Sequence, residues 1–244
     1  MKVGSGSAPS PEGFRGYIPE LDIFRAFGVT AVILYHTWVY RPRFWNMLDV
    51  GWIIMDTFFV LSGFLIAGIL LDTRSRPDYY WSFYTRRALR ILPAYYLLIS
   101  FLTLCSIFHG SGLLYPSDPA LYKWGSPWWF FVYLGNLPVA ITGQHPTAVR
   151  NCFVPLWSLQ IEEQFYLLFP LLVRRLKLQT LAHTLLGLAC FSMLLRVVLY
   201  WLFPANNLLE YVLLPCRMDG LALGAWVPFA IARDPGTPPK GDSP

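Results

Sequence analysis

The chain has 244 residues, of which 55% are apolar, 17% aromatic and only 14% charged, and its mean hydropathy is positive. This composition excludes a disordered chain and a soluble globular domain, and it is typical of an integral membrane protein. The net charge of +5 does not indicate a nucleic-acid partner, because the cations flank apolar runs as they do at the cytoplasmic ends of membrane spans. Four cysteines without a CxxC pair predict neither a disulfide framework nor a metal site.

The chain opens with a polar lead, followed by an apolar run that contains charge. Residues 1–20 are rich in Gly, Ser and Pro, and we expect a flexible segment on the cytoplasmic side. The first predicted span covers residues 22–40 and includes Arg25 and His36. Their spacing of eleven positions is close to three helical turns, so both side chains leave one face of the helix, about 16 Å apart along its axis. Ionisable residues inside a span are costly and commonly functional, so we single out this pair.

Two further spans flank a cationic stretch. A second span is expected over residues 51–71, where the small residues at 62–63 would allow another helix to approach closely. The arginine-rich stretch over residues 72–90 should lie on the cytoplasmic side. We expect the third span from about residue 88 to residue 108, leading outward.

The second half of the chain alternates apolar runs with short polar breaks. Residues 128–142 form a short run interrupted by Gly, Asn and Pro, which predicts a re-entrant or interfacial segment. Three more spans are expected over residues 155–173, 180–203 and 208–231. Residues 233–244 should be a disordered, Pro-rich tail. The predicted fold class is therefore all-α: a polytopic transmembrane helix bundle over residues 21–232, with about six spans and one re-entrant or interfacial segment.

The pair in the first span allows two interpretations. A neutral imidazole at His36 can take a proton from a hydroxyl at physiological pH, with Arg25 as a cation nearer the cytoplasm. Alternatively, His36 is a buried histidine bonded to a neighbouring helix, and Arg25 is a cation that extends to the membrane surface.

A second candidate group lies at the cytoplasmic end of the third span. Arg87 and Arg90 are three residues apart and therefore share one helical face. Arginines at a membrane boundary commonly reflect topology alone. Guanidinium pairs also bind phosphates bidentately, so an anionic cofactor that enters from the cytoplasm is the functional alternative.

The fifth apolar run carries two adjacent acids, Glu162 and Glu163, and Ser158 lies on the same face as Glu162. One interpretation is a salt bridge between helices to a buried arginine. The other is a carboxylate that orients or charges His36, or that holds an acceptor.

A further charged pair occupies the last predicted span. Arg217 and Asp219 are two positions apart and point to different sides of a helix, so each should have its partner on a different helix, and a structural role is favoured. Buried Arg, His and Glu also occur in transporters, which form the alternative functional class. No internal repeat of the kind that transporters show is visible in the sequence.

Together, several motifs resemble the acyltransferase 3 family of membrane O-acyltransferases, over about residues 17–226. The motifs are Arg25 and His36 with ten residues between them, FFVLSGFLI, Arg87-x-x-Arg90, WSLQIEEQFYLLFP and RMDGLALGA. The resemblance implies transfer of an acyl group, commonly acetyl from acetyl-CoA, to a hydroxyl of a carbohydrate such as a surface glycan. We expect no metal cofactor, and we expect the chain in the bacterial inner membrane with a cytoplasmic N-terminus, which Lys2 and Arg15 favour.

The resemblance also implies roles for individual residues. His36 would be the base or proton carrier, with Arg25 as its partner and Glu162 close by, and Arg87 with Arg90 would form the acyl-CoA site. The residues expected to bind the acceptor are Ser158, Glu163 and Arg217. Family members are usually longer, with more spans after the RMDG helix, so we expect a truncated chain, and a non-catalytic member is the alternative function.

Overall fold

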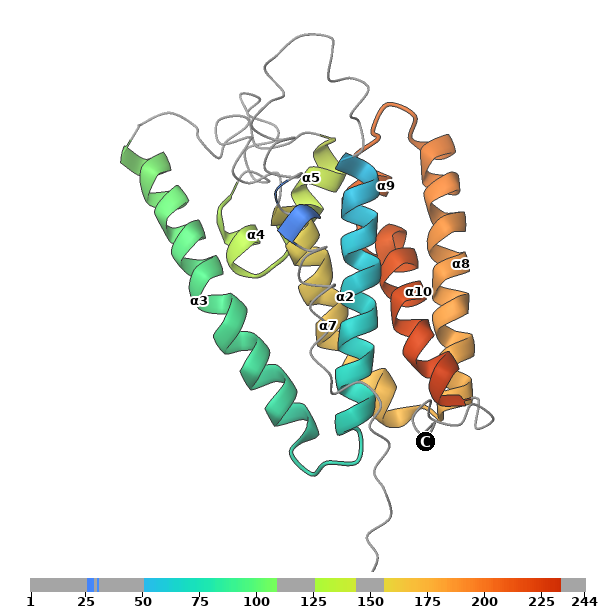
Figure 1. Ribbon diagram of the computed structural model, residues 1–244. Helices are drawn as coiled ribbons and strands as arrows, with labels where there is room; N and C mark the ends of the chain where they lie inside the picture. The colour runs from blue at the N-terminus through green and yellow to red at the C-terminus, as the bar shows by residue number, and fades with distance from the viewer. Residues whose placement is uncertain (1–25, 29, 31–50, 109–125, 144–155, 234–244) are drawn as a thin grey trace, which may run out of the picture.

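The computed structural model describes residues 26–28, 30, 51–108, 126–143 and 156–233, and helices are its regular structure throughout these ranges. Five helices have 20 residues or more and lie side by side as a bundle (Figure 1). They are α2 (Gly51–Thr73), α3 (Tyr79–Phe108), α7 (Leu156–Arg175), α8 (Leu178–Leu202) and α10 (Leu214–Arg233). The prediction of an all-α bundle is confirmed. Of the first predicted span only residues 26–28 and 30 are described, and they are helical.

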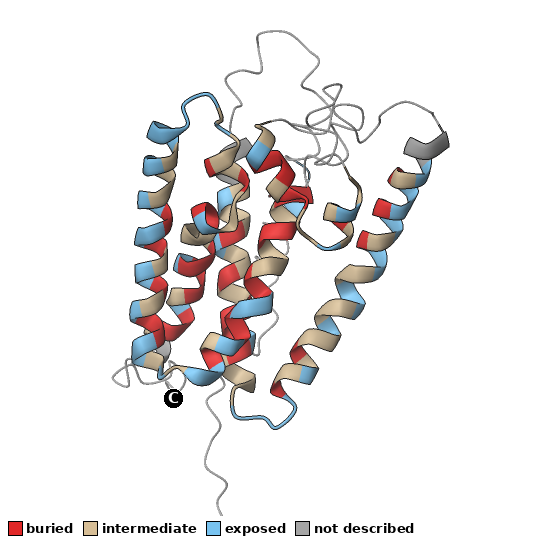
Figure 2. Ribbon diagram, turned by 180° about the vertical axis from the view of Figure 1, so that it is seen from behind, coloured by how far each residue is buried: buried red, intermediate tan, exposed pale blue. Residues whose placement is uncertain are grey.

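Within the described ranges, three helical segments are long and apolar enough to cross a membrane: Met55–Thr73, Tyr79–Leu104 and Leu178–Leu202. Helices α7 and α10 have 20 residues each, which is about 30 Å and enough to cross, but each carries several charged residues. Figure 2 shows exposed residues along one side of α8 and buried ones along the side that faces the bundle. Exposed apolar side chains such as Leu97 and Trp201 suit contact with lipid.

Helices α2 and α10 pack with their backbones in contact. A Cβ atom added to Gly63 would lie 2.1 Å from the Leu221 carbonyl oxygen, and one added to Gly224 would lie 1.9 Å from the Val60 carbonyl oxygen. Neither position has room for a side chain. The close approach predicted at residues 62–63 is therefore confirmed, and its partner is α10.

Two boundaries differ from those predicted. Helix α3 begins at Tyr79 rather than near residue 88, because Tyr79 and Phe83 are buried one turn apart and extend the packed face before the apolar run starts. The last expected span is split into α9 (Leu209–Val212) and α10, since Leu213 between them is extended. Pro215 then stands in the first turn of α10, where a missing N–H is tolerated.

Residues 128–142 form two short helices, α4 (Trp128–Phe131) and α5 (Asn136–Thr142). With four and seven residues, neither can cross a bilayer, so the expectation that this run does not span is confirmed. The backbone reverses at Tyr133, whose φ is 58°. The Gln164 amide donates to the Tyr133 carbonyl oxygen at 2.8 Å and to Asn136 Oδ1 at 2.9 Å. Helix α7 therefore holds this α4–α5 hairpin.

The cations gather at one end of the bundle. The α2–α3 loop and the α7–α8 turn meet there, because an Arg74 Nη2 group donates to the Leu176 carbonyl oxygen. Figure 1 shows both connections at the same end, which is also where α10 finishes. The cationic residues in these two connections and at the adjoining helix end are Arg74, Arg76, Arg174, Arg175 and Lys177.

Candidate functional site

A cavity of about 570 Å³ lies between α2, α3 and α7. It follows α2 from Ser62 to Thr73, which is about three turns or 16 Å, towards the cationic end of the bundle. One part of its wall is apolar, formed by Leu65, Ile66, Ile69, Phe83 and Ile91. The rest is polar and charged, formed by Ser62, Thr73, Ser82, Arg86, Arg87, Arg90, Glu162 and Tyr166.

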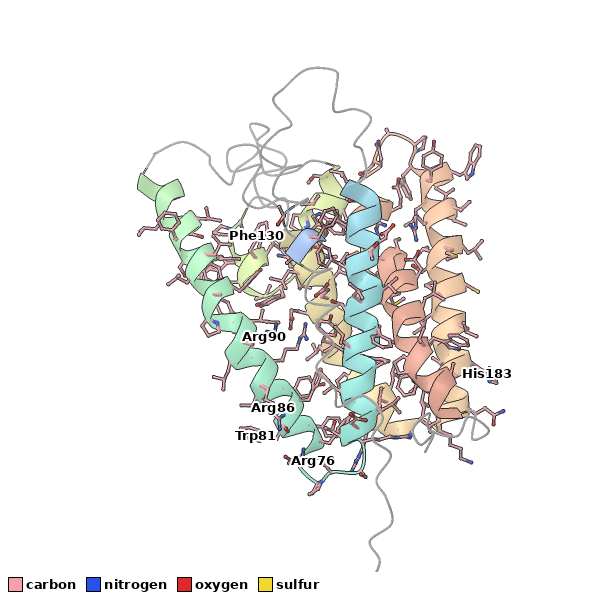
Figure 3. The ribbon with its side chains drawn as sticks, viewed as in Figure 1. Arg76, Trp81, Arg86, Arg90, Phe130 and His183 are labelled. Carbon is pink, nitrogen blue, oxygen red and sulfur yellow. The ribbon has the colours of Figure 1, made fainter. Side chains whose placement is uncertain are left out.

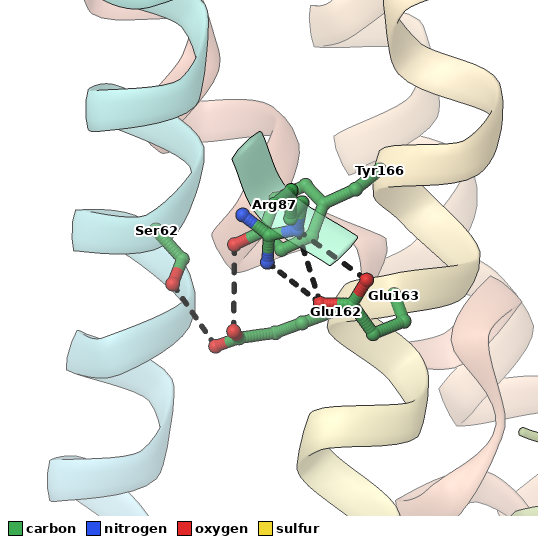
Figure 4. A network of polar contacts seen from close by, with 5 residues as sticks. All are labelled: Ser62, Arg87, Glu162, Glu163 and Tyr166. Carbon is green, nitrogen blue, oxygen red and sulfur yellow. Dashed lines mark hydrogen bonds and ion pairs between the residues drawn. The ribbon is translucent and has the colours of Figure 1, made fainter. Parts of the chain in front are cut away.

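Glu162 is held by two hydroxyl groups (Figure 4). Ser62 Oγ on α2 donates to Glu162 Oε1 at 3.0 Å, and Tyr166 OH, one turn further along α7, donates to Glu162 Oε2 at 3.4 Å. Both groups that bond Glu162 are hydroxyl donors, and its carboxyl group forms part of the cavity wall. Sequence reasoning took Ser62 only as a small residue for helix packing. Its second role, the hydrogen bond to Glu162, joins two residues that are 100 positions apart in the chain, so no local pattern indicated it.

Arg87 and Glu163 form an ion pair between α3 and α7. Arg87 Nη2 lies 2.8 Å and Nε 3.0 Å from Glu163 Oε1, and each side chain is 17% exposed. The guanidinium carbon also lies 3.4 Å from the centre of the Tyr166 ring, so the group is fixed by its edge and by its face (Figure 4). The interpretation of a salt bridge to a buried arginine is thus confirmed for Glu163.

Arg86 and Arg90 line the same cavity with exposed side chains. Figure 3 shows them in succession along α3, beyond Trp81 near the start of the helix and Arg76 in the α2–α3 loop. Within the described part of the chain, neither has an ion-pair partner. Sequence reasoning named Arg90 and missed Arg86 as a site residue, although the four-residue spacing to Arg90 could have indicated it.

Arg217 lies away from the cavity wall. Its Nη1 atom is 2.8 Å from Asp56 Oδ1 on α2, its Nε donates to the Tyr211 carbonyl oxygen at 3.0 Å, and its guanidinium carbon lies 4.2 Å from the Tyr211 ring centre. Asp219 pairs instead with Arg196 on α8. The prediction that these two charges have partners on different helices is confirmed.

The structure therefore brings together part of the predicted site. Glu162, Arg87 and Arg90 share the cavity, and Glu163 reaches it through Arg87. Ser158 lies one turn before Glu162 on α7, outside the cavity lining. Arg25 and His36 lie outside the described residues.

The cavity combines groups that suit an anionic ligand. Guanidinium groups of α3 can bind phosphate or carboxylate oxygens. The carboxylate of Glu162 lies close to Arg87, since Tyr166 contacts both, and it can accept a hydrogen bond from a hydroxyl or orient a cationic partner. Among the residues that the structure describes, no three His, Cys, Asp or Glu side chains gather as metal ligands.

Comparison with known proteins gives the family. O-acetyltransferase OatA of Staphylococcus aureus (strain NCTC 8325 / PS 47) is 33% identical over 232 residues, covering 89% of this chain and 36% of the relative. Peptidoglycan O-acetyltransferase OatA of Listeria monocytogenes is 36% identical over 161 residues, covering 64% of this chain and 24% of the relative. Putative peptidoglycan O-acetyltransferase YrhL of Bacillus subtilis is 37% identical over 161 residues, covering 64% of this chain and 23% of the relative.

The chain spans about a third or less of the length of these curated relatives. No solved structure matches it. The family model Acyl_transf_3, described as an acyltransferase domain, matches residues 18–232. Since that match covers most of the sequence, the chain belongs to the acyltransferase 3 family.

Proposed function

We propose that this chain is a membrane-embedded O-acetyltransferase, which moves an acetyl group from acyl-CoA to a hydroxyl group of a cell-surface glycan. The observation that carries the proposal is the cavity between α2, α3 and α7, which arginines of α3 and the Glu162 carboxylate line together. Two of the matched relatives are named peptidoglycan O-acetyltransferases, which supports a glycan acceptor of that kind.

The cationic end of the bundle faces the cytoplasm in this proposal. Arginine and lysine residues favour cytoplasmic loops, and both the α2–α3 loop and the α7–α8 turn carry them. Helix α2 runs towards this end, so a first span over residues 22–40 would start there and place the N-terminus in the cytoplasm. We place the protein in the bacterial inner membrane, where acyl-CoA reaches the cavity from the cytoplasm and the glycan from outside.

The phosphate groups of the donor lie along the arginine-bearing face of α3 in this proposal, at the motif that contains the paired Arg87 and the exposed Arg90. The apolar wall of the cavity suits the uncharged arm that joins the phosphates to the thioester. This arrangement directs the acetyl group towards Glu162 and the middle of the bundle.

The transfer step uses the residues of the first span. The acceptor hydroxyl gives its proton to His36, its oxygen attacks the thioester carbonyl carbon, and the carbon–sulfur bond breaks. The leaving thiolate takes up the proton, while Arg25 stabilises the negative charge on the carbonyl oxygen during attack. Glu162 orients His36 or the acceptor, and Ser158, near the end of α7 opposite the cationic loops, contacts the acceptor. Arg217 is buried near the same end of α10 and acts on the acceptor through its partner Asp56, whose side chain is exposed. Glu163 acts through Arg87.

The test is acetyl transfer in membranes from a host that lacks such an enzyme. Membranes that contain the chain should transfer label from acetyl-CoA to the glycan fraction, and His36→Ala should abolish the transfer. The matched control is His183→Ala, since His183 is an exposed histidine on α8 that does not line the cavity, and Figure 3 shows it distant from the lining residues Arg86 and Arg90. Equal transfer by wild type and His36→Ala would refute the assignment of the base, and absence of transfer by the inserted wild-type chain would refute the proposed activity.

A further inference from the structure

Three arginines of α3 line one cavity, but their surroundings differ. The positive charge of Arg87 is balanced by Glu163, which lies 2.8 Å away, and its guanidinium face is covered by the Tyr166 ring. A phosphate placed against Arg87 would also meet the Glu163 carboxylate, and two anions in a partly buried site repel each other. Arg87 is therefore a poor primary contact for an anion, although it is part of the family motif.

Arg86 and Arg90 have the opposite properties. Both side chains are exposed, both line the cavity, and neither is paired with an acid in the described ranges. They are four residues apart on a continuous helix, so they leave nearly the same face, about 6 Å apart along the axis. Ser82, four residues before Arg86, adds a hydroxyl to this face of the cavity.

Two unpaired guanidinium groups one turn apart suit a phosphate group. Each can direct two N–H donors at the phosphate oxygens, and the two cations together balance the charge of a dianion.

We propose that Arg86 and Arg90, rather than Arg87 and Arg90, form the pair that holds a phosphate group of the acyl donor. This inference rests on the proposed function, since it needs a phosphate-bearing donor in the cavity. Arg86 becomes a ligand-binding residue, and Arg87 remains the ion-pair partner that joins α3 to Glu163 of α7.

The experiment measures binding of coenzyme A and of pantetheine, which lacks the phosphates, to the purified full chain in phosphatidylcholine nanodiscs. Arg86→Gln should weaken coenzyme A binding by about 10-fold or more, as expected for the loss of charge-assisted hydrogen bonds to phosphate. Pantetheine binding should stay the same. Arg86→Lys, which keeps the charge without the planar fork, should restore part of the affinity.

Arg76→Gln is the matched control. Arg76 lies in the α2–α3 loop near the same end of the bundle, is paired with Asp78 and does not line the cavity. Its replacement removes the same charge from the protein, so it should leave coenzyme A binding within about 2-fold if local contact and not net charge is responsible. The double variant Arg87→Gln with Glu163→Gln, which removes the neutral pair, should lose less affinity than Arg86→Gln.

The outcomes separate the two proposals. If the wild-type chain binds coenzyme A and Arg86→Gln binds it equally well, or if the double variant loses more affinity than Arg86→Gln, the assignment of Arg86 is overturned while the donor site stands. If Arg86→Gln weakens pantetheine as much as coenzyme A, phosphate recognition by Arg86 is also overturned. If the wild-type chain binds no coenzyme A, both the donor proposed above and the role of Arg86 fail.

Discussion

Replacing Gly63 with Ala should disturb both the packing of the bundle and the site. The added Cβ atom would lie 2.1 Å from the Leu221 carbonyl oxygen, about 0.9 Å inside the 3.0 Å limit that Cβ contacts essentially never cross. The obstacle is backbone of α10, which cannot rotate away as a side chain can, so α2 and α10 must separate by roughly 1 Å. We expect a cost of about 1–3 kcal/mol, as for other overpacked interiors.

The same shift should reach Glu162. Ser62 precedes Gly63 on α2, and its hydroxyl lies 3.0 Å from Glu162 on α7. A displacement of about 1 Å would take this contact beyond hydrogen-bonding distance. We therefore expect Gly63→Ala to lower acetyl transfer as well as stability.

The assay combines unfolding of the purified chain in mixed micelles, titrated with a denaturing detergent, with acetyl transfer in membranes. The matched control is Gly187→Ala on α8, where an added Cβ would meet nothing within 4 Å. This control should keep wild-type transfer and equal or higher stability, because Ala favours a helix over Gly. Unchanged stability of Gly63→Ala would refute the close contact between α2 and α10, and lost stability with unchanged transfer would refute the link to Glu162.

Three more changes test the polar contacts. Glu162→Gln keeps an acceptor for Ser62 but removes the charge, and it should lower the rate of acetyl transfer by about 100-fold or more if the carboxylate takes part in the reaction. Arg87→Ala and Glu163→Ala, measured singly and together in the unfolding assay, should show a coupling energy of about 0.5–3 kcal/mol. Gln164→Leu leaves the Tyr133 carbonyl without its amide donor, and it should cost about 1–3 kcal/mol in the same assay.

For each of these predictions, one result would contradict it. If Glu162→Gln transfers acetyl at the wild-type rate, the carboxylate takes no part in the reaction. Strictly additive energies for the two Ala variants would show that the ion pair contributes nothing to stability. The control for Gln164→Leu is Gln179→Leu, at an exposed position of α8, and an equal effect of the two would contradict the proposed anchoring of the α4–α5 hairpin.

Apolar periodicity and length predicted the class of fold because they are local properties of the chain. The expected span at residues 51–71 matches α2 closely, and the short run at 128–142 breaks as its Gly, Asn and Pro residues indicate. The spacing of Arg217 and Asp219 also predicted partners on two different helices. Each of these inferences depends only on residues near one another in the sequence.

What the sequence did not predict depends on tertiary contact. The start of α3 follows from Tyr79, whose burial is not visible from its neighbours and whose hydroxyl donates to the Pro170 carbonyl oxygen at 3.1 Å. For the adjacent acids the sequence left open which one pairs with an arginine. Glu162 accepts from hydroxyl groups and Glu163 pairs with Arg87, because they leave α7 in directions about 100° apart. Arg86 and Arg87 are likewise adjacent on α3 and leave it in directions about 100° apart, so Arg86 is exposed while Arg87 pairs with Glu163.

The most direct test of the account is to locate the donor on the protein. An acyl-CoA analogue with a photoreactive group in its acyl chain would be irradiated with the full chain in membranes, and the labelled peptides identified by mass spectrometry. The account predicts labelling in the walls of the cavity, on the segments that carry Ser62, Ile69 and Phe83, and loss of that labelling when excess coenzyme A is present. Labelling on the outer face of α8, or labelling that coenzyme A does not displace, would contradict the central claim that this cavity holds the acyl donor.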